Sequence, residues 1–404
     1  MGKVFEGVRV VELAQFVFVP AAGALLADHG AEVIHIEQVG DGDPYRVLNI
    51  ADGRVTKSAN LSMEQNNRGK LSLAIDLKTE DGRDVFLKLI ETADVFVTSL
   101  RPKAIEGLRL GIDELRARNP RLIYARGNGV GFKGREINKA GYDASAFWAR
   151  GGFATALRPA GHDEPIKPRS ALGDHASSVA VAYGIAGALF KRARTGEPSV
   201  VDISLLASAM WTLSADIVVS QTRTPEQMAQ VSSPLRFPLK HAYRTRDGRY
   251  VQLMFLDPNR YWRPLCDRIG RDDLVQDERF ATADGRVENG ALLIDEIQSE
   301  IGAKDWAAWR PIFEAWDAPW ELVKFVHEIA DDPQAIANGY MFDVEVADGT
   351  KVNLASGPVG FDGQVGPADP RCAPLLGEHT DRILGEIGYT PTDLAQLRAR
   401  SVIQ

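Results

Sequence analysis

The first half of the chain alternates short apolar runs with helical patterns, and this alternation restricts the fold more than any other feature. The apolar runs predict buried strands at Val8–Ala14, Glu32–Glu37, Leu71–Leu77, Asp94–Leu100 and Leu122–Gly127. Helical patterns lie between them at Ala21–His29, Glu80–Thr92 and Ile112–Asn119. Such an alternation is typical of a doubly wound parallel sheet with helices on both faces. We therefore predict an α/β fold with a Rossmann-like parallel sheet.

The pattern changes from about Gln221 onward. Ser232-Ser233-Pro234 is typical of a linker, and residues 242–253 predict a β-hairpin that turns at Asp247-Gly248. Helical patterns follow at Arg260–Ile269, Asn289–Ile301 and Asp305–Ala315. A chain of 404 residues is long enough for two domains, or for one domain with a substantial insertion.

Composition excludes several classes of protein. The net charge of -8, with no basic arm or stripe, argues against a nucleic-acid-binding protein. The two cysteines, Cys266 and Cys372, lack the spacing of metal ligands and suit a reducing compartment. The N-terminus lacks the apolar core of a signal peptide, and no apolar stretch is long enough to span a bilayer. We expect a cytoplasmic protein with no metal site and no membrane partner.

The predicted sheet indicates where a ligand should bind. In open α/β sheets ligands bind beyond the carboxyl ends of the strands, which here are followed by the loops 15–20, 38–46, 100–103 and 127–142. A dinucleotide site would need a GxGxxG turn after the first strand, and the sequence there is Gln15-Phe16-Val17-Phe18. An NAD-dependent dehydrogenase is therefore disfavoured.

Asp174 is the strongest candidate for a reactive residue. It lies in Leu172-Gly173-Asp174-His175, directly before a helical stretch rich in small residues at Ala176–Arg194. We expect Asp174 at the N-cap, where free N–H groups and the helix dipole would keep its carboxylate ionised. The same N–H groups could bind a developing oxyanion. The pattern alone favours an N-cap without chemistry.

Segments along nearly the whole chain, in this order and spacing, resemble the class III CoA-transferases, the family of the formyl-CoA and carnitine CoA-transferases. They are Gly7–Leu13, Leu26–Ile34, Asn67–Lys70, Asp76–Lys78, Leu100–Pro102, the Gly173-Asp174 helix with its end Phe190–Glu197, the strand Val200–Leu206, and Leu375–Thr380. The resemblance implies a large CoA-binding domain over residues 1–220 and a small α+β domain over 221–335. A C-terminal segment, 336–404, would return to the large domain. It also implies an interlocked homodimer.

The resemblance implies that Asp174 is a catalytic nucleophile. The enzyme would move coenzyme A between an acyl-CoA donor and a carboxylic acid through aspartyl anhydride and aspartyl-CoA thioester intermediates. CoA is then a substrate, and no permanently bound cofactor is needed. A non-catalytic CoA-binding protein is a third alternative, which the intact Gly173-Asp174 pair disfavours.

Tyr142-Asp143 is the second candidate site, because the formyl-CoA transferase pattern has a Tyr followed by an acidic residue that lines the acyl pocket. Asp143 could orient this network, or only cap the helix that follows it. The related α-methylacyl-CoA racemases have His-Asp here and use the His as a second base. Tyrosine, with an ordinary pKa near ~10, suits that task poorly. The transferase is the first hypothesis, and an acyl-CoA racemase is the alternative.

The remaining contacts to CoA follow from position in the family. Gln15, Phe16 and Val17 correspond to a stretch near the pantetheine and the reacting carbonyl. Ile75 and Lys78 match adenosine-binding residues, and Leu100 replaces a stacking aromatic residue. We also expect a contact from Lys139. Since two arginines that bind phosphate in the formyl-CoA enzyme are absent, we expect that role to fall to Arg46, Arg68 or Arg101.

Overall fold

The computed structural model describes residues 3–48, 60–159, 162–224, 227–228 and 237–404, so the linker signal at 232–234 lies outside the described residues. Contacts within the chain group it into two compact units. Unit 1 comprises Met1–Arg158, Asp163–Ile217 and Pro333–Gln404, and unit 2 comprises Pro159–His162 and Val218–Asp332. The roles expected for a large and a small domain stay predictions.

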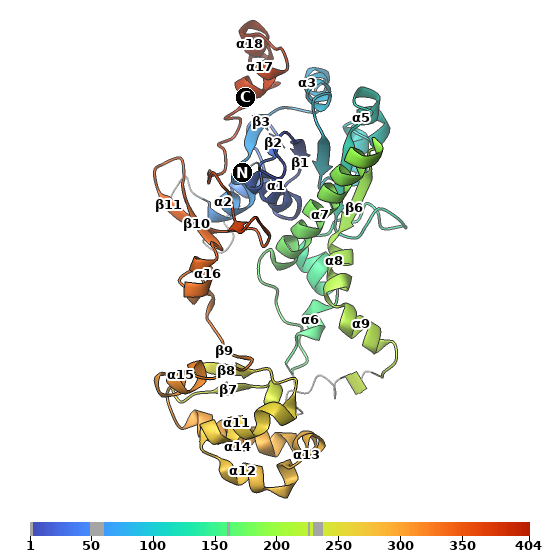
Figure 1. Ribbon diagram of the computed structural model, residues 1–404. Helices are drawn as coiled ribbons and strands as arrows, with labels where there is room; N and C mark the ends of the chain where they lie inside the picture. Colours follow the sequence, from blue (N-terminus) through green and yellow to red (C-terminus); the bar gives the residue numbers. More distant parts are fainter. Residues whose placement is uncertain (1–2, 49–59, 160–161, 225–226, 229–236) are drawn as a thin grey trace. The chain divides into compact units, whose positions relative to one another are not determined.

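Unit 1 is built on a sheet of six strands, all parallel, in the order β3-β2-β1-β4-β5-β6 (Figure 1). This is the strand order of a Rossmann-like sheet, and it confirms the predicted α/β fold with a parallel sheet. The strands are β1 (Arg9–Leu13), β2 (Glu32–Glu37), β3 (Leu71–Ala74), β4 (Val95–Thr98), β5 (Ile123–Asn128) and β6 (Val200–Ser204).

Alternate residues of these strands face two separate hydrophobic cores. On one face, Val11, Ile34 and Leu73 pack against α3 (Glu80–Ile90), α5 (Ile112–Arg118), α17 (Thr380–Glu386) and α18 (Pro391–Ala399). On the other face, Val10 and Val97 pack against α1 (Phe18–Asp28), α7 (Leu172–Thr195) and α8 (Leu205–Thr212). Both faces of the sheet are therefore buried, which explains why its strands read as continuous apolar runs.

Some element boundaries differ from those predicted. Strand β3 ends at Ala74 rather than Leu77, because Ile75 forms an isolated bridge with Ile403 near the C-terminus. Helix α1 begins at Phe18, ahead of the predicted Ala21. The sequence pattern does not predict α2 (Leu61–Asn67), α4 (Pro102–Gly107) or α6 (Phe153–Ala156), which are only about one or two turns long.

The rest of unit 1 includes two small antiparallel sheets near the C-terminus. The segment expected to return at Phe342–Val352 forms β10 (Met341–Glu345), which pairs with β11 (Lys351–Ala355). The second sheet pairs β12 (Gly360–Phe361) with β13 (Gln364–Val365), and α16 (Pro333–Ala337) precedes them. Helix α9 (Ser214–Ser220) follows α8 in the chain.

The described residues of unit 2 include a sheet of three strands and the helices α11 to α15, packed around a separate hydrophobic core. The predicted hairpin is present as β7 (Ala242–Arg244) and β8 (Tyr250–Leu253), and β9 (Trp320–Leu322) pairs with β8. The helices are α11 (Pro258–Ile269), α12 (Asp272–Gln276), α13 (Ala283–Glu288), α14 (Gly290–Gly302) and α15 (Trp306–Glu314). No helix in the described part of the chain combines the length and apolarity needed to cross a bilayer.

Candidate active site

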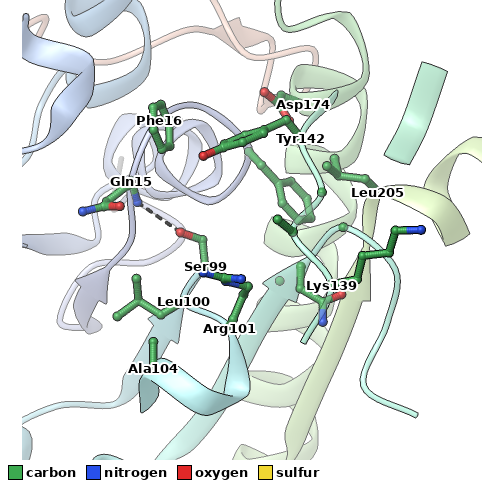
Figure 2. A pocket seen from close by; sticks show the side chains of 16 residues that line it. Gln15, Phe16, Ser99, Leu100, Arg101, Ala104, Lys139, Tyr142, Asp174 and Leu205 are labelled. Atoms are coloured by element: carbon green, nitrogen blue, oxygen red, sulfur yellow. Dashed lines mark hydrogen bonds between the residues drawn. The ribbon is translucent and has the colours of Figure 1, made fainter. Parts of the chain in front are cut away.

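The site lies in unit 1 at the point where the strand order reverses. Strands β1 and β4 are neighbours in the sheet, and the loops that follow them run to opposite sides. A cavity of about 260 Å³, here called the central cavity, is lined by both loops. Its walls also include the segments after β5 and before the π-helix Asp143–Ala149, together with Asp174 and Leu205 (Figure 2).

Two further cavities share residues with the central one. The distal cavity, about 120 Å³, contains Ile75 and Lys78 and shares Gln15 and Leu100 with the central cavity. The lateral cavity, about 320 Å³, shares Phe16, Tyr142 and Asp174 with the central cavity. Asp174 therefore lies where the central and lateral cavities meet. The sequence-predicted residues are distributed over these cavities: Gln15, Phe16, Leu100, Arg101, Lys139, Tyr142 and Asp174 line the central one, Val17 and Asp143 the lateral one, and Ile75 and Lys78 the distal one.

The predicted N-cap position of Asp174 is wrong. Helix α7 begins at Leu172 with Ala171 as its N-cap, so Asp174 occupies the third position of the first turn. The free N–H at the start of this helix is bound by a residue distant in sequence. Both carboxylate oxygens of Asp143 accept a hydrogen bond from the Gly173 N–H at 3.1 Å. Asp143 thus caps α7, and the helix that follows Tyr142 begins with Asp143 itself.

The expectation that the helix end keeps Asp174 ionised is also wrong. Burial of its carboxyl group and the charge of the nearby Asp143 raise the pKa of Asp174 to about 7. Burial also raises the pKa of Asp143, which the Gly173 N–H partly offsets. The two carboxyl groups form a coupled pair in which charge on one disfavours charge on the other. A carboxyl group with a pKa near neutrality, in a cavity, is typical of a reactive site.

The turn after β1 forms the wall beside Asp174. The Gln15 N–H donates to Ser99 Oγ at 3.1 Å, which joins this turn to the loop after β4 (Figure 2). Phe16 has a φ of 66°, in the left-handed region that non-glycine residues rarely adopt. Its ring lies edge-on to Tyr142, with the ring centroids 5.4 Å apart, and Figure 2 shows the Tyr142 ring next to Asp174.

The structure separates the basic candidates into two groups. Arg46 is bound by Glu37 through Nε and Nη2, at 2.7 and 2.6 Å, and lines none of the three cavities. Arg68 is buried in an ion pair with Asp28. In contrast, Lys78 and Arg101 line the cavities, and neither side chain forms an ion pair within the described part of the chain. Lys139 pairs with Glu136 at 3.0 Å. Of the basic residues predicted from the sequence, Lys78 and Arg101 are therefore the ones available to an anionic ligand.

Several lining residues had no signal in the sequence. Tyr45 and Arg169 line the lateral cavity, and Ser99 and Leu205 line the central one. The exposed Arg169 makes no hydrogen bond or ion pair to any described residue. His175, which follows Asp174, is bound to Asn66 Oδ1 at 2.8 Å, as expected for a structural residue. Within the described ranges no group of His, Cys, Asp and Glu side chains could hold a metal ion.

Comparisons with known proteins all point to the same family. The sequence profile of CoA-transferase family III matches residues 5–380. The (R)-2-hydroxy-4-methylpentanoate CoA-transferase of Clostridioides difficile is 30% identical over 400 residues, covering 99% of each chain. The cinnamoyl-CoA:phenyllactate CoA-transferase of Clostridium sporogenes is 32% identical over 402 residues, covering 98% of this chain and 96% of that protein.

A solved structure is similar over almost the whole chain. A CAIB/BAIF family protein from Brucella suis superimposes with a TM-score of 0.82 at 26% identity, covering 96% of this chain and 100% of the other. The resemblance inferred from the sequence motifs is thereby confirmed, with CoA transfer between acyl-CoA and carboxylic acids as the activity that the relatives support. The chain belongs to CoA-transferase family III.

Proposed function

We propose that this protein transfers coenzyme A from an acyl-CoA donor to a carboxylic acid acceptor, with Asp174 as the covalent nucleophile. The observation that carries the proposal is the position of Asp174 at the junction of two cavities, where both a thioester and an acid could reach it. Asp143 holds the backbone of Gly173 and so fixes the first turn on which Asp174 stands.

The reaction balances without a redox or metal step. A carboxylate oxygen of Asp174 attacks the donor thioester carbonyl, and the C–S bond breaks. CoA departs as the thiolate, and the acyl group stays on Asp174 as an aspartyl anhydride. The thiolate then attacks the aspartyl carbonyl and releases the donor acid, which gives an aspartyl-CoA thioester. The acceptor carboxylate displaces the thiolate again, and thiolate attack on the acceptor's carbonyl forms the new acyl-CoA and frees Asp174.

The three cavities fit the parts of these substrates. The distal cavity, with Ile75 and Lys78, suits the adenosine end of CoA, and Arg101, which lines the central cavity, suits a phosphate. The central cavity then takes the pantetheine arm and the thioester. The lateral cavity suits the acid, because Phe16, Tyr45 and Leu48 offer apolar surface and Arg169 a cation. A larger, partly apolar acid is the acceptor we expect.

An acyl-CoA racemase is not favoured. Two-base racemisation requires a second group that can accept a proton from carbon, and Tyr142 occupies the position of the racemase His. The nearby His175 is held by Asn66 and lines none of the three cavities. The interlocked homodimer and the cytoplasmic location stay predictions.

The test is a screen of acyl-CoA donors (acetyl-, succinyl- and cinnamoyl-CoA) against carboxylic acids, with products identified by mass spectrometry. Hydroxylamine added during turnover should convert residue 174 to a hydroxamate, which peptide mass spectrometry locates. Asp174→Asn should lower the exchange rate on the order of 10³-fold or more, since it removes the nucleophile.

The matched control is Asp202→Asn, which removes an exposed carboxylate on β6 whose partner is Arg126 and which lines none of the cavities. It should leave exchange unchanged. Full exchange by Asp174→Asn, or a label found on another residue, would refute the assignment.

A further inference from the structure

A buried network of charged side chains lies behind the turn after β1. His35 Nδ1 is 2.7 Å from Glu12 Oε1, and Lys70 Nζ donates to the same oxygen at 2.6 Å. The other ring nitrogen, His35 Nε2, lies 3.6 Å from Asp43 Oδ2. All four side chains are 0% or nearly 0% exposed. The proposed mechanism uses none of them.

The His35 ring, itself held by Glu12, lies against the Asp43 carboxylate and helps to keep it in one place. Burial alone would lower the pKa of His35, but the Asp43 and Glu12 carboxylates raise it to about 9. Taking a charged group out of water is costly unless opposite charges and hydrogen bonds compensate. We therefore ask which part of the structure this buried network holds in place.

Asp43 holds the turn after β1, at Phe16, which lies in the wall beside Asp174. Its two carboxylate oxygens accept from the Phe16 N–H at 3.3 and 3.2 Å, and Oδ1 also accepts from the Tyr45 N–H at 2.8 Å. Phe16 has the left-handed backbone that an L residue adopts only at a cost of about 1–3 kcal/mol. Bonds from Asp43 to the backbone N–H groups of Phe16 and Tyr45 can maintain that conformation.

The Phe16 ring is placed by this turn between two cavities. Phe16 lines both the central and the lateral cavity, and its ring contacts Tyr142 and Tyr45 edge-on, with centroids 5.4 and 6.3 Å away. Since Asp174 is shared by the same two cavities, a displaced ring would open one into the other beside the reacting carbonyl. Water reaching an aspartyl anhydride or thioester there would hydrolyse it, giving free acid and CoA in place of transfer.

We propose that Asp43, backed by His35, is a positioning residue that holds Phe16 as the partition between the donor and acceptor cavities and so keeps the covalent intermediates from water. The proposal rests on the proposed function. It assigns to Asp43 no contact with substrate, only the placing of Phe16.

The experiment compares Asp43→Asn with Phe16→Leu and with the double variant, using the best donor and acid found for the wild type. The ratio of hydrolysis to transfer should rise by about 10-fold or more in each single variant, because small displacements beside a reacting centre have effects of this size. If Asp43 acts through Phe16, the double variant should match Phe16→Leu alone rather than combine the two effects.

The matched control is Asp28→Asn. Asp28 is also a buried carboxylate of unit 1, ion-paired with Arg68, and lines none of the three cavities. A hydrolysis ratio that rises equally in Asp28→Asn and Asp43→Asn, or a double variant with additive effects, would overturn the proposal. If Asp43→Asn does not fold, Phe16→Leu still tests the partition, because it leaves the charged network intact. A ratio of hydrolysis to transfer that is unchanged in Phe16→Leu would contradict the proposal.

A second readout does not depend on activity. Amide hydrogen exchange at Phe16 should quicken by about 10-fold or more in Asp43→Asn and stay unchanged in Asp28→Asn, because only the first replaces one of the two carboxylate oxygens that accept from that N–H with an NH2 group and removes the negative charge. Unchanged exchange at Phe16 would overturn the positioning role even in an active enzyme. A wild type that transfers no CoA to any acid would instead refute the proposed function, and the role of Asp43 in transfer with it.

Discussion

The pKa of Asp174 sets how the reaction should depend on pH. Only the carboxylate form attacks a thioester, and burial together with Asp143 raises the pKa of Asp174 to about 7. We therefore expect kcat/KM to rise with pH, with a midpoint near the same value, and then to level off. Asp143→Asn removes a neighbouring like charge, so it should move the midpoint to lower pH, although burial still acts. The amide oxygen can continue to accept from the Gly173 N–H.

The same shift predicts the sign of a stability change. The pKa of Asp174 is higher in the folded protein than its ordinary value of 3.8, so the folded state binds the proton more tightly. The wild type should lose stability as the pH rises from about 4 to about 7, and Asp143→Asn should lose less. Urea unfolding at pH 5 and pH 8 measures this, with Asp202→Asn as the variant that should behave as wild type.

The pH dependence of kcat/KM tests the coupling of Asp174 to Asp143 separately. A midpoint of kcat/KM that stays at the same pH or moves to higher pH in Asp143→Asn would contradict the coupling.

For single residues, the sequence is informative where a residue belongs to a local motif. Asp174 and Tyr142-Asp143 could be predicted as site residues because each lies in a short pattern that resembles the family's. Asp43 gave no such signal: an Asp before Pro44 predicts a cap for the turn that follows, and it does bind the Tyr45 N–H. Its second bond, to the Phe16 N–H, joins two loops distant in sequence. Only the folded sheet brings those loops together.

The first turn of α7 has room for no side chain at Gly173. A Cβ there would overlap the Phe147 ring and the Asp143 carboxylate. Gly173→Ala should therefore destabilise the protein by about 1–3 kcal/mol, as overpacking does. It should also lower exchange by about 10-fold or more, because it displaces the group that caps the helix of Asp174.

Gly187 provides the matched control on the same helix. A Cβ at Gly187 meets nothing within 4 Å, so Gly187→Ala should gain up to ~1 kcal/mol from helix propensity and leave exchange unchanged. Thermal unfolding and exchange rates of the two variants measure both effects. Equal stability of the two variants would show that the close packing around Gly173 is not maintained in solution.

Helices and strands were predictable where a long apolar pattern specifies them. Strand β2 has the predicted bounds, and α3 begins at the predicted Glu80, where Thr79 Oγ1 accepts from the Gly82 N–H. The start of α7 was wrong because its cap is not local: Asp143 supplies it from the segment after β5. Sequence rules for helix ends assume that the capping side chain lies beside the helix in the chain.

At the scale of the whole molecule, the alternation of strands and helices predicted the six-stranded parallel sheet of unit 1, because few topologies bury such strands on both faces. The same reasoning could not predict how copies of the chain assemble. Large apolar side chains remain exposed in unit 1, notably Tyr183 on α7 at 80% and Trp211 on α8 at 81%. Exposed apolar side chains of this size on neighbouring helices are typical of a surface that a partner covers.

The homodimer expected from the family would cover such a surface, and light scattering should then give twice the chain mass of 44.2 kDa. An interlocked dimer makes a stronger prediction, since two threaded chains cannot separate without unfolding. Two preparations with different affinity tags, mixed under native conditions, should form no mixed dimers over days. After joint unfolding in urea and refolding, mixed dimers should be about half of the total, as random pairing requires. A monomer mass would refute the dimer, and mixed dimers formed without denaturant would refute the interlocking, because ordinary subunit exchange needs only dissociation.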